Sequence, residues 1–220
     1  MKVCTDACIL GAWTAMKAQT LLINNILDIG CGTGLLSLML AQKTNALVDA
    51  IEINTDAAEQ AGENVIRSPW PGNINIVNSS ILDFKTVTKY DLIICNPPFY
   101  EDDLRSNDEN KNAAKHGTTL KLEELLTSVK EKLHEQGMAS VLLPFQRTAF
   151  FEISAKKRSL FVQEKLLIKQ TPAHDHFRSV ILLSSEFNDE PTINELIIHD
   201  EQRNYTAAFK SLMADYYLNL

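Results

Sequence analysis

The amino-acid sequence predicts an α/β fold with a mostly parallel central sheet, helices on both faces and an antiparallel C-terminal hairpin. Short apolar runs alternate with helix-forming segments through most of the chain, which is the pattern of successive β-α units. Two long apolar runs, 161–170 and 179–187, then follow each other with only a short polar segment between them, which predicts the hairpin. Because 220 residues with 45% hydrophobic content can bury one substantial core, we expect a single domain over 1–220.

The first half of the chain predicts four strands and two helices. Apolar runs place the strands at 26–29, 46–53, 74–77 and 90–95. The first run stops at a group of glycines, after which a helix is expected at 35–42. A second helix is expected at 55–66, with Thr55 as its N-cap and Asp56 near its positive end.

The second half of the chain completes the pattern. A charged amphipathic helix is expected at 120–135 and is ended by Gly137, and the strand that follows, 138–143, is stopped by Pro144. After a helix at 146–157 and the two strands of the hairpin, we expect an edge strand at 195–199 and a final helix at 205–218. His174, His176 and Arg178 are interpreted as a polar turn between the hairpin strands.

Composition and charge exclude several classes of protein. No apolar run approaches the roughly 18 residues of a membrane span, and there is no signal-peptide pattern. The four cysteines show no metal-ligand spacing, so we expect a cytoplasmic monomer with unpaired thiols and without a metal. A net charge of −7 argues against non-specific binding of nucleic acid by the whole surface, although it leaves room for a local basic patch.

A glycine-rich turn follows the first expected strand, in the order Asp28-Ile29-Gly30-Cys31-Gly32-Thr33-Gly34. The glycines Gly30, Gly32 and Gly34 let the backbone turn tightly and approach a ligand, and the next helix begins with free N–H groups. Such a turn alone fits several nucleotide-binding families. Asp28 before the turn repels a pyrophosphate but favours a cationic ligand, such as the sulfonium or amino group of S-adenosylmethionine.

Carboxylates also follow the next two strands. Glu52 can accept hydrogen bonds from both hydroxyls of a ribose, and Asp83 can accept one from an adenine amino group. We place Ile53, next to Glu52, in the same expected cofactor site. The alternative is that these acids, with Asp28, are ordinary side chains at strand ends, but three of them beside one glycine turn favour a nucleotide-like ligand.

The fourth expected strand runs into Asn96-Pro97-Pro98-Phe99-Tyr100. A side-chain amide, a rigid backbone carbonyl and an aromatic ring around one point suit a planar amine, because both N–H groups are accepted while the ring covers the plane. The alternative is a simple strand terminator, since proline ends a β-ladder. Together with the glycine turn, the motif favours methyl transfer from S-adenosylmethionine to a nitrogen.

These motifs resemble those of class I, Rossmann-like methyltransferases, and Asn96-Pro97-Pro98-Phe99 resembles the catalytic motif of amino-group methyltransferases. More narrowly, the chain is similar to the bacterial tRNA adenine-N6 methyltransferases that modify position 37 of a valine tRNA. The closer likeness covers almost the whole chain and rests on the segments 1–6, 10–13, 115–116, 122–125, 205–209 and 215–218.

The resemblance implies S-adenosylmethionine as cofactor, S-adenosylhomocysteine as product, and the N6 amino group of an adenine in the anticodon loop of tRNA as acceptor. Asn96, which also borders the cofactor, and Pro97 are then the catalytic acceptors of the amine's hydrogen bonds, while Phe99 and Tyr100 stack on the base. Lys2 and Thr5 belong to an opening segment that closes over the cofactor.

The chain departs from the family pattern in three respects. Cys4 stands where the family has glycine, and its Cβ alters how the opening segment closes. Cys31 is a small replacement within a Gly-Thr-Gly-Thr-Gly turn. Because the family usually carries an N-terminal extension before the Met-Lys-Val segment, we expect that this sequence lacks one.

A long polar stretch follows the Asn-Pro-Pro motif and is too long for a routine connection. Its basic residues are the expected RNA contacts: Arg105, Lys111, Lys115 and His116. A second basic cluster, Lys156-Lys157-Arg158, is expected to add a further contact.

Two other functions stay open at this point. The first is methylation of a protein glutamine at N5, because that side-chain amide offers the same NH2 geometry; such enzymes commonly have tyrosine where this chain has Phe99. The second is a cofactor-binding protein without activity, against which the intact Asn96 and Asp28 argue.

Overall fold

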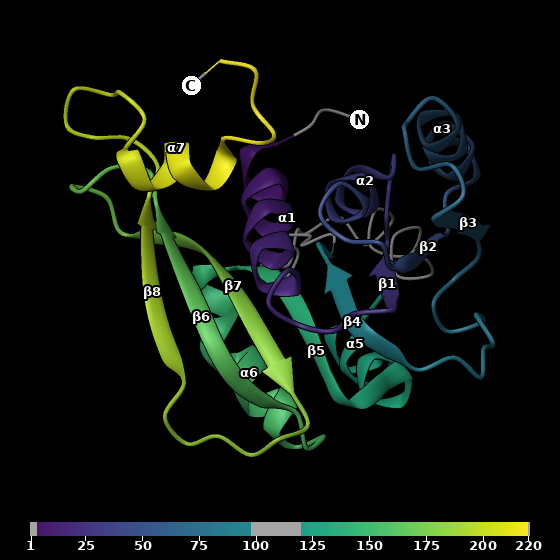
Figure 1. Cartoon of the computed structure of the whole chain (residues 1–220). Helices are drawn as coiled ribbons and strands as arrows, with labels where there is room; N and C mark the ends of the chain where they lie inside the picture. Colours follow the sequence, from purple (N-terminus) through teal and green to yellow (C-terminus); the bar gives the residue numbers. More distant parts are fainter. Residues whose placement is uncertain (1–3, 98–119, 220) are drawn as a thin grey trace, which may run out of the picture.

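The computed structural model describes residues 4–97 and 120–219. The described strands form one eight-stranded sheet in the order β3-β2-β1-β4-β5-β7-β6-β8 (Figure 1). The strands are β1 (Asn25–Ile29), β2 (Leu47–Glu52), β3 (Ile74–Asn78), β4 (Tyr90–Cys95), β5 (Leu133–Pro144), β6 (Phe161–Lys169), β7 (His176–Ser184) and β8 (Thr192–Ile197). The helices are α1 (Thr5–Ala18), α2 (Leu35–Ala41), α3 (Thr55–Ile66), α5 (Leu122–Lys132), α6 (Thr148–Lys156) and α7 (Ala207–Met213), with a 3₁₀ turn η1 (Phe145–Arg147).

The sheet is mostly parallel, as the sequence predicts. The strands β3, β2, β1, β4 and β5 pair in parallel, whereas β7 pairs antiparallel with both β5 and β6, and β8 lies parallel to β6 at the edge. The chain runs outward from β1 to β3 and then returns to the other side of β1 with β4. In open α/β sheets a ligand crevice forms at this reversal, outside the carboxyl ends of the strands. We call that end of the sheet the carboxyl edge and the opposite end the amino edge.

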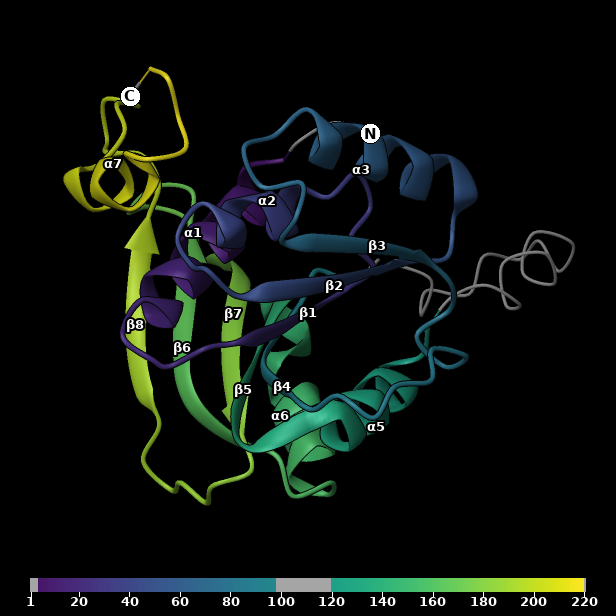
Figure 2. The same ribbon diagram turned by 45° about the vertical axis from the view of Figure 1, so that its right-hand side comes forward.

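Helices cover both faces of the twisted sheet (Figure 2). The helices α1, α2 and α3 pack on one face with a core that includes Leu10, Leu40 and Val48. The helices α5 and α6 pack on the other face, where Leu126 and Phe151 are fully buried. Within the described residues, no helix combines the length and the apolar character that crossing a bilayer requires.

The sequence analysis assigned no element to the residues that form α1. This helix lacks an obvious polar face because almost every residue from Ala7 to Ala15 is buried, and helices buried on all sides give no amphipathic signal. Its polar side chains reach distant strands: Thr14 Oγ1 lies 2.7 Å from Ser140 Oγ, and Lys17 pairs with Glu164 at 2.6 Å. The strands of the second half of the chain therefore hold α1 in place.

Several element boundaries differ from those expected. The N-cap of α3 is Asn54, whose side chain accepts a hydrogen bond from the Ala57 N–H, and not Thr55. Helix α5 ends at Lys132 because β5 begins directly after it. His176 and Arg178 lie within β7, so only His174 belongs to the turn. The last helix, α7, covers only part of the expected range 205–218.

Gly137 lies inside β5 rather than at a helix end, and it gives a prediction about stability. A Cβ at this position would lie 2.7 Å from the backbone oxygen of Tyr90 and 3.1 Å from that of His134. Because a backbone cannot move aside as a flexible side chain can, Gly137→Ala should lower the free energy of unfolding by roughly 1–3 kcal/mol in urea denaturation. Gly72→Ala is the control, since its Cβ meets nothing within 4 Å. Equal midpoints for the two variants would contradict the expectation.

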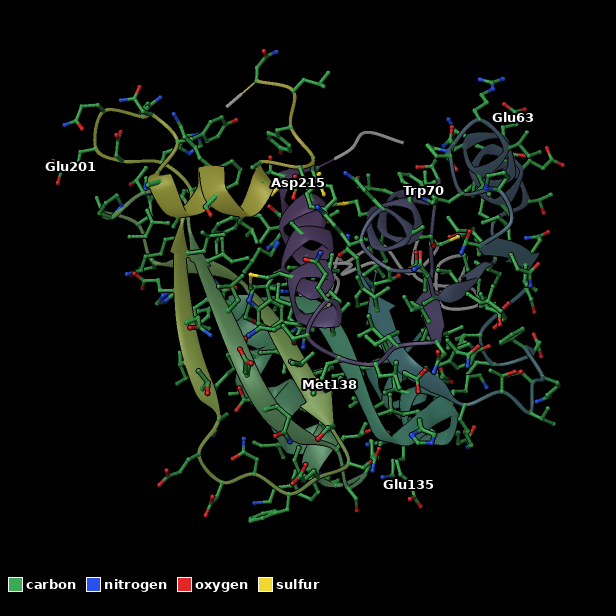
Figure 3. All side chains as sticks on the ribbon, viewed as in Figure 1. Glu63, Trp70, Glu135, Met138, Glu201 and Asp215 are labelled. Atoms are coloured by element: carbon green, nitrogen blue, oxygen red, sulfur yellow. The ribbon has the colours of Figure 1, made fainter. Side chains whose placement is uncertain are left out.

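The segment after β8 returns to the start of α1. The rings of His199, Tyr205 and Phe209 stack in sequence, with centroids 4.9 and 4.7 Å apart, and Tyr217 meets Phe209 edge-on. Tyr217 in turn lies beside Thr5 and Cys8 of α1. Asp215, labelled in Figure 3, pairs with Lys43 after α2 at 2.6 Å. We call residues 199–217 the C-terminal clasp, because they fasten α7 to α1 and α2.

Candidate active site

The glycine turn lies at the carboxyl edge, between β1 and α2. Gly30, Gly32 and Gly34 have φ angles of 72°, 57° and 85°, a region that residues with a Cβ rarely adopt. The Gly30 N–H donates to the Ile51 carbonyl at 2.8 Å, and the Asn64 side chain donates to the Thr33 carbonyl at 2.9 Å. A Cβ built on Gly30 would meet no described residue within 4 Å, so the described part of the chain leaves this side of the turn open.

Glu52 ends β2 beside this turn and supports it. One carboxylate oxygen accepts the Gly32 N–H at 2.8 Å, and the other accepts the Asn54 N–H at 2.8 Å. Each oxygen keeps a second acceptor position, so two further donors can be bound. The neighbouring Ile53 is 55% exposed and offers an apolar surface next to Glu52. Asp83 is exposed in a turn after β3, where its N–H donates to the Ser80 carbonyl.

Asp28 is fully buried beneath the turn. Its Oδ2 accepts hydrogen bonds from Ser37 N at 3.1 Å and Ser37 Oγ at 2.6 Å, whereas Oδ1 has no partner among the described residues. Burial raises the pKa of Asp28 from 3.8 to about 7, against the opposite effect of the Ser37 hydrogen bonds. The sequence analysis did not identify Ser37, although a hydroxyl in the first turn of the next helix is a signal for such a partner.

The buried carboxyl of Asp28 makes the stability of the protein depend on pH. Between pH 3.8 and about 7 the unfolded chain loses this proton while the folded chain keeps it. The contribution of Asp28 to stability is therefore fully present below pH 3.8 and is lost as the pH rises to about 7. Relative to that of Asp28→Asn, the free energy of unfolding of the wild type should fall by at most roughly 1.4 kcal/mol per pH unit across this window. Above the window it should change little. Unfolding free energies of both proteins at a series of pH values measure the difference; parallel profiles would contradict it.

Asn96 and Pro97 follow β4 directly at the carboxyl edge. In the parallel register Ile29 of β1 lies opposite Cys95 of β4, so Asn96 comes level with Gly30 on the neighbouring strand. Asn96 is half-buried and Pro97 is buried. Within 4–97 and 120–219 the Asn96 side chain makes no hydrogen bond to another residue, so its amide oxygen is available to a ligand.

The structure brings together the residues of the glycine turn, Glu52, Ile53 and Asn96 around the β1–β4 reversal, and Thr5 begins α1. The other expected site residues lie outside the described part of the chain: Lys2, Phe99, Tyr100, Lys111, Lys115 and His116. The second basic cluster, 156–158, lies at the amino edge, because it directly precedes the start of β6. It stands at the opposite end of the sheet from Asn96.

The arrangement fits an S-adenosyl ligand. The open space above Gly30 admits a ligand close to the backbone, and Glu52 can accept the two hydroxyls of a ribose. The unpartnered oxygen of Asp28 lies behind the turn, where a bound cationic group would favour the ionised form of this carboxyl.

Comparison with known proteins identifies the family of this chain. Residues 13–141 match the model of the methyltransferase small domain. All of the chain aligns, at 39% identity, with 92% of the tRNA1(Val) (adenine(37)-N6)-methyltransferase of Cytophaga hutchinsonii, and at 36% identity with 94% of the protein of that name from Flavobacterium johnsoniae. Among solved structures, one described as a predicted O-methyltransferase from Agrobacterium tumefaciens is similar with a TM-score of 0.73 and 19% identity, over 98% of this chain and 100% of that one. The chain therefore belongs to the family of tRNA1(Val) (adenine(37)-N6)-methyltransferases.

Proposed function

We propose that this chain transfers a methyl group from S-adenosylmethionine to the exocyclic N6 of an adenine in tRNA, at position 37 in the anticodon loop of a valine tRNA. The observation that carries the proposal is the position of Asn96 and Pro97, which follow β4 beside the glycine turn of β1. Family membership supports the choice of acceptor, since the relatives bear this activity in their names.

The reactivity of adenine explains why an Asn-Pro pair is needed. The N6 lone pair is delocalised into the ring and is a poor nucleophile. Hydrogen bonds from the amino group to the Asn96 side-chain oxygen and the Pro97 carbonyl favour a more tetrahedral nitrogen and aim its lone pair. Proline suits this position because it fixes the backbone and has no N–H to compete. The buried setting of Pro97 keeps its carbonyl rigid.

The remaining residues bind and orient the ligands. S-adenosylmethionine would supply the methyl group from its sulfonium to the N6 nitrogen, which would release one proton to water. Glu52 and Ile53 hold the ribose and the base, with Asp83 accepting from the adenine amino group of the cofactor. Asp28 is buried and acts only through the turn, where a bound cationic group would favour its ionised form. Thr5 and Lys2 come from the opening segment.

The proposal also covers the setting of the reaction. We propose that the protein acts as a monomer. A tRNA substrate implies the cytoplasm. The acceleration comes from positioning and electrostatics, for which the residues named above suffice without a strong general base.

Incubation with methyl-labelled S-adenosylmethionine and bulk bacterial tRNA, followed by nucleoside analysis, tests the proposal. We expect label in N6-methyladenosine, at position 37 of valine tRNA when the RNA is fragmented and mapped. Label in protein glutamine with none in tRNA would instead support the glutamine-N5 alternative. No label in either, with intact cofactor binding, would leave a protein without methyltransferase activity.

A further inference from the structure

The carboxyl edge of the sheet continues past the candidate active site. In the strand register Cys95 lies opposite Val141, Val141 opposite Ile181, and Arg178 opposite Pro144. Arg178 therefore stands three residues beyond the level of Cys95 and two strands to the side. With about 3.3 Å per residue and about 4.8 Å per strand, that is roughly 10 Å above and roughly 10 Å beside the end of β4. The ends of β5 and β7 thus extend beyond the end of β4, to one side of Asn96.

Aromatic and basic side chains lie at the carboxyl-edge ends of β5, β6 and β7. The ring of Phe145 lies against the ring of His176, with centroids 5.0 Å apart and planes tilted by 37°. His174 is exposed in the turn before β7. We call the following five residues the rim: Phe145, Lys169, His174, His176 and Arg178.

Two acidic side chains, one from β8 and one from α1, bind the basic residues of the rim. Glu195 of β8 bonds His176 Nε2 at 2.8 Å and Lys169 Nζ at 3.0 Å. Asp6 of α1 accepts from Arg178 Nε at 2.9 Å. Because these contacts fix half-buried side chains, little ordering is required when a ligand binds. The acids also compensate much of the positive charge, so the rim offers rings and hydrogen-bond donors at short range rather than a long-range field.

We infer that the rim binds the tRNA strand beside the nucleotide that is methylated, with a neighbouring base stacked on the Phe145–His176 pair. This inference rests on the proposed function. Single-stranded RNA loops are recognised by bases stacked on aromatic and histidine rings, with hydrogen-bond donors alongside. A chain with net charge −7 needs such short-range contacts. The rim meets this need on the same edge as Asn96, and the basic residues 156–158 lie at the other end of the sheet.

The opposite edge of the sheet supplies a matched control. Phe187 follows β7 and is 63% exposed, and His134 is exposed near the start of β5. Both belong to the amino edge, as does Glu135, labelled near the foot of Figure 3. The double variant Phe145→Ala/His174→Glu removes two rings, one phenyl and one imidazole, and adds one carboxylate at the rim. Phe187→Ala/His134→Glu makes the same chemical changes at the far end.

Equilibrium binding of bulk bacterial tRNA, measured with S-adenosylhomocysteine present, tests the inference. We expect the rim variant to bind tRNA about tenfold more weakly or worse, the scale of one lost base stack. The amino-edge variant should match the wild type. Affinity for S-adenosylhomocysteine should be unchanged in both. The single variant Phe145→Tyr keeps an aromatic ring and the native His174, so it should bind tRNA as the wild type does.

Other outcomes would overturn the inference. The rim makes no specific contact if the two double variants bind tRNA with equal affinity. This holds whether both bind as the wild type does or both bind more weakly by the same factor. If Phe145→Ala lowers the melting temperature so far that the double variant does not fold, His174→Glu alone in the exposed turn carries the test, against His134→Glu. A rim variant with native tRNA affinity, beside a wild type that methylates tRNA, would refute the rim and leave the proposed function intact. A wild type that neither binds nor methylates tRNA would refute the proposed function itself.

Discussion

Asn96→Ala should lower the single-turnover rate of tRNA methylation at least about a hundred-fold while cofactor affinity stays within a few-fold of the wild type. In the proposed function the amide oxygen acts mainly in the transition state, where it would hold the amino group in line with the methyl group. The half-buried position of Asn96, level with Gly30, places it where such an oxygen is needed. Rapid-quench measurement with labelled cofactor gives the rate, and calorimetric titration gives the affinity.

The matched control is Asn45→Ala. Asn45 is exposed before β2, at the amino edge, and truncating it should change neither quantity. A near-native methylation rate for Asn96→Ala would place the chemistry elsewhere in the protein. A loss of cofactor affinity equal to the loss of rate would instead make Asn96 a binding residue.

Glu52→Ala should weaken binding of S-adenosylmethionine by about 2 kcal/mol or more, equivalent to roughly thirty-fold in Kd. Two effects combine in this variant. The ribose hydroxyls lose a charged acceptor, and the Gly32 and Asn54 N–H groups lose the oxygens that hold the turn. Calorimetric titration of the folded variant measures the change.

Two further variants separate these effects. Glu52→Gln keeps one acceptor oxygen and should recover part of the affinity, whereas Glu59→Ala removes an exposed carboxylate from α3 and should have none of the effect. Unchanged affinity in Glu52→Ala would remove Glu52 from the cofactor site. An equal loss in both glutamate-to-alanine variants would point to a general effect of charge.

The sequence predicts the parallel part of the sheet well because its strands are short, mostly apolar runs that end at distinctive residues. The run before Gly30 and the run before Asn96 are examples, and both became strands within one residue of their expected bounds. The reversal between β1 and β4 then follows from the connection rules of α/β proteins. Hence the proximity of the glycine turn to Asn96 could be anticipated from the sequence.

Other features depend on contacts between distant parts of the chain. Asp28 reads as a carboxylate at a strand end, and only the packing of α2 over it shows that it is buried against Ser37. His176 and Arg178 read as turn residues because polar side chains seldom open a central strand, yet Glu195 and Asp6 provide their partners. No local pattern reports partners that are separated so far in sequence.

The position of the C-terminal clasp in the sequence affects when helix α1 can fold during translation. Helix α1 leaves the ribosome before every strand of the sheet, but the side chains that contact it belong to β5, β6, β7 and Tyr217. At roughly 5–20 residues per second, α1 waits on the order of ten seconds or more for those partners. A nascent chain that stopped short of the clasp would already contain the glycine turn, Asn96 and the strand partners of α1, but it would lack Tyr217 beside Thr5 and Cys8. Residues that are translated well after α1 thus decide when this helix can dock.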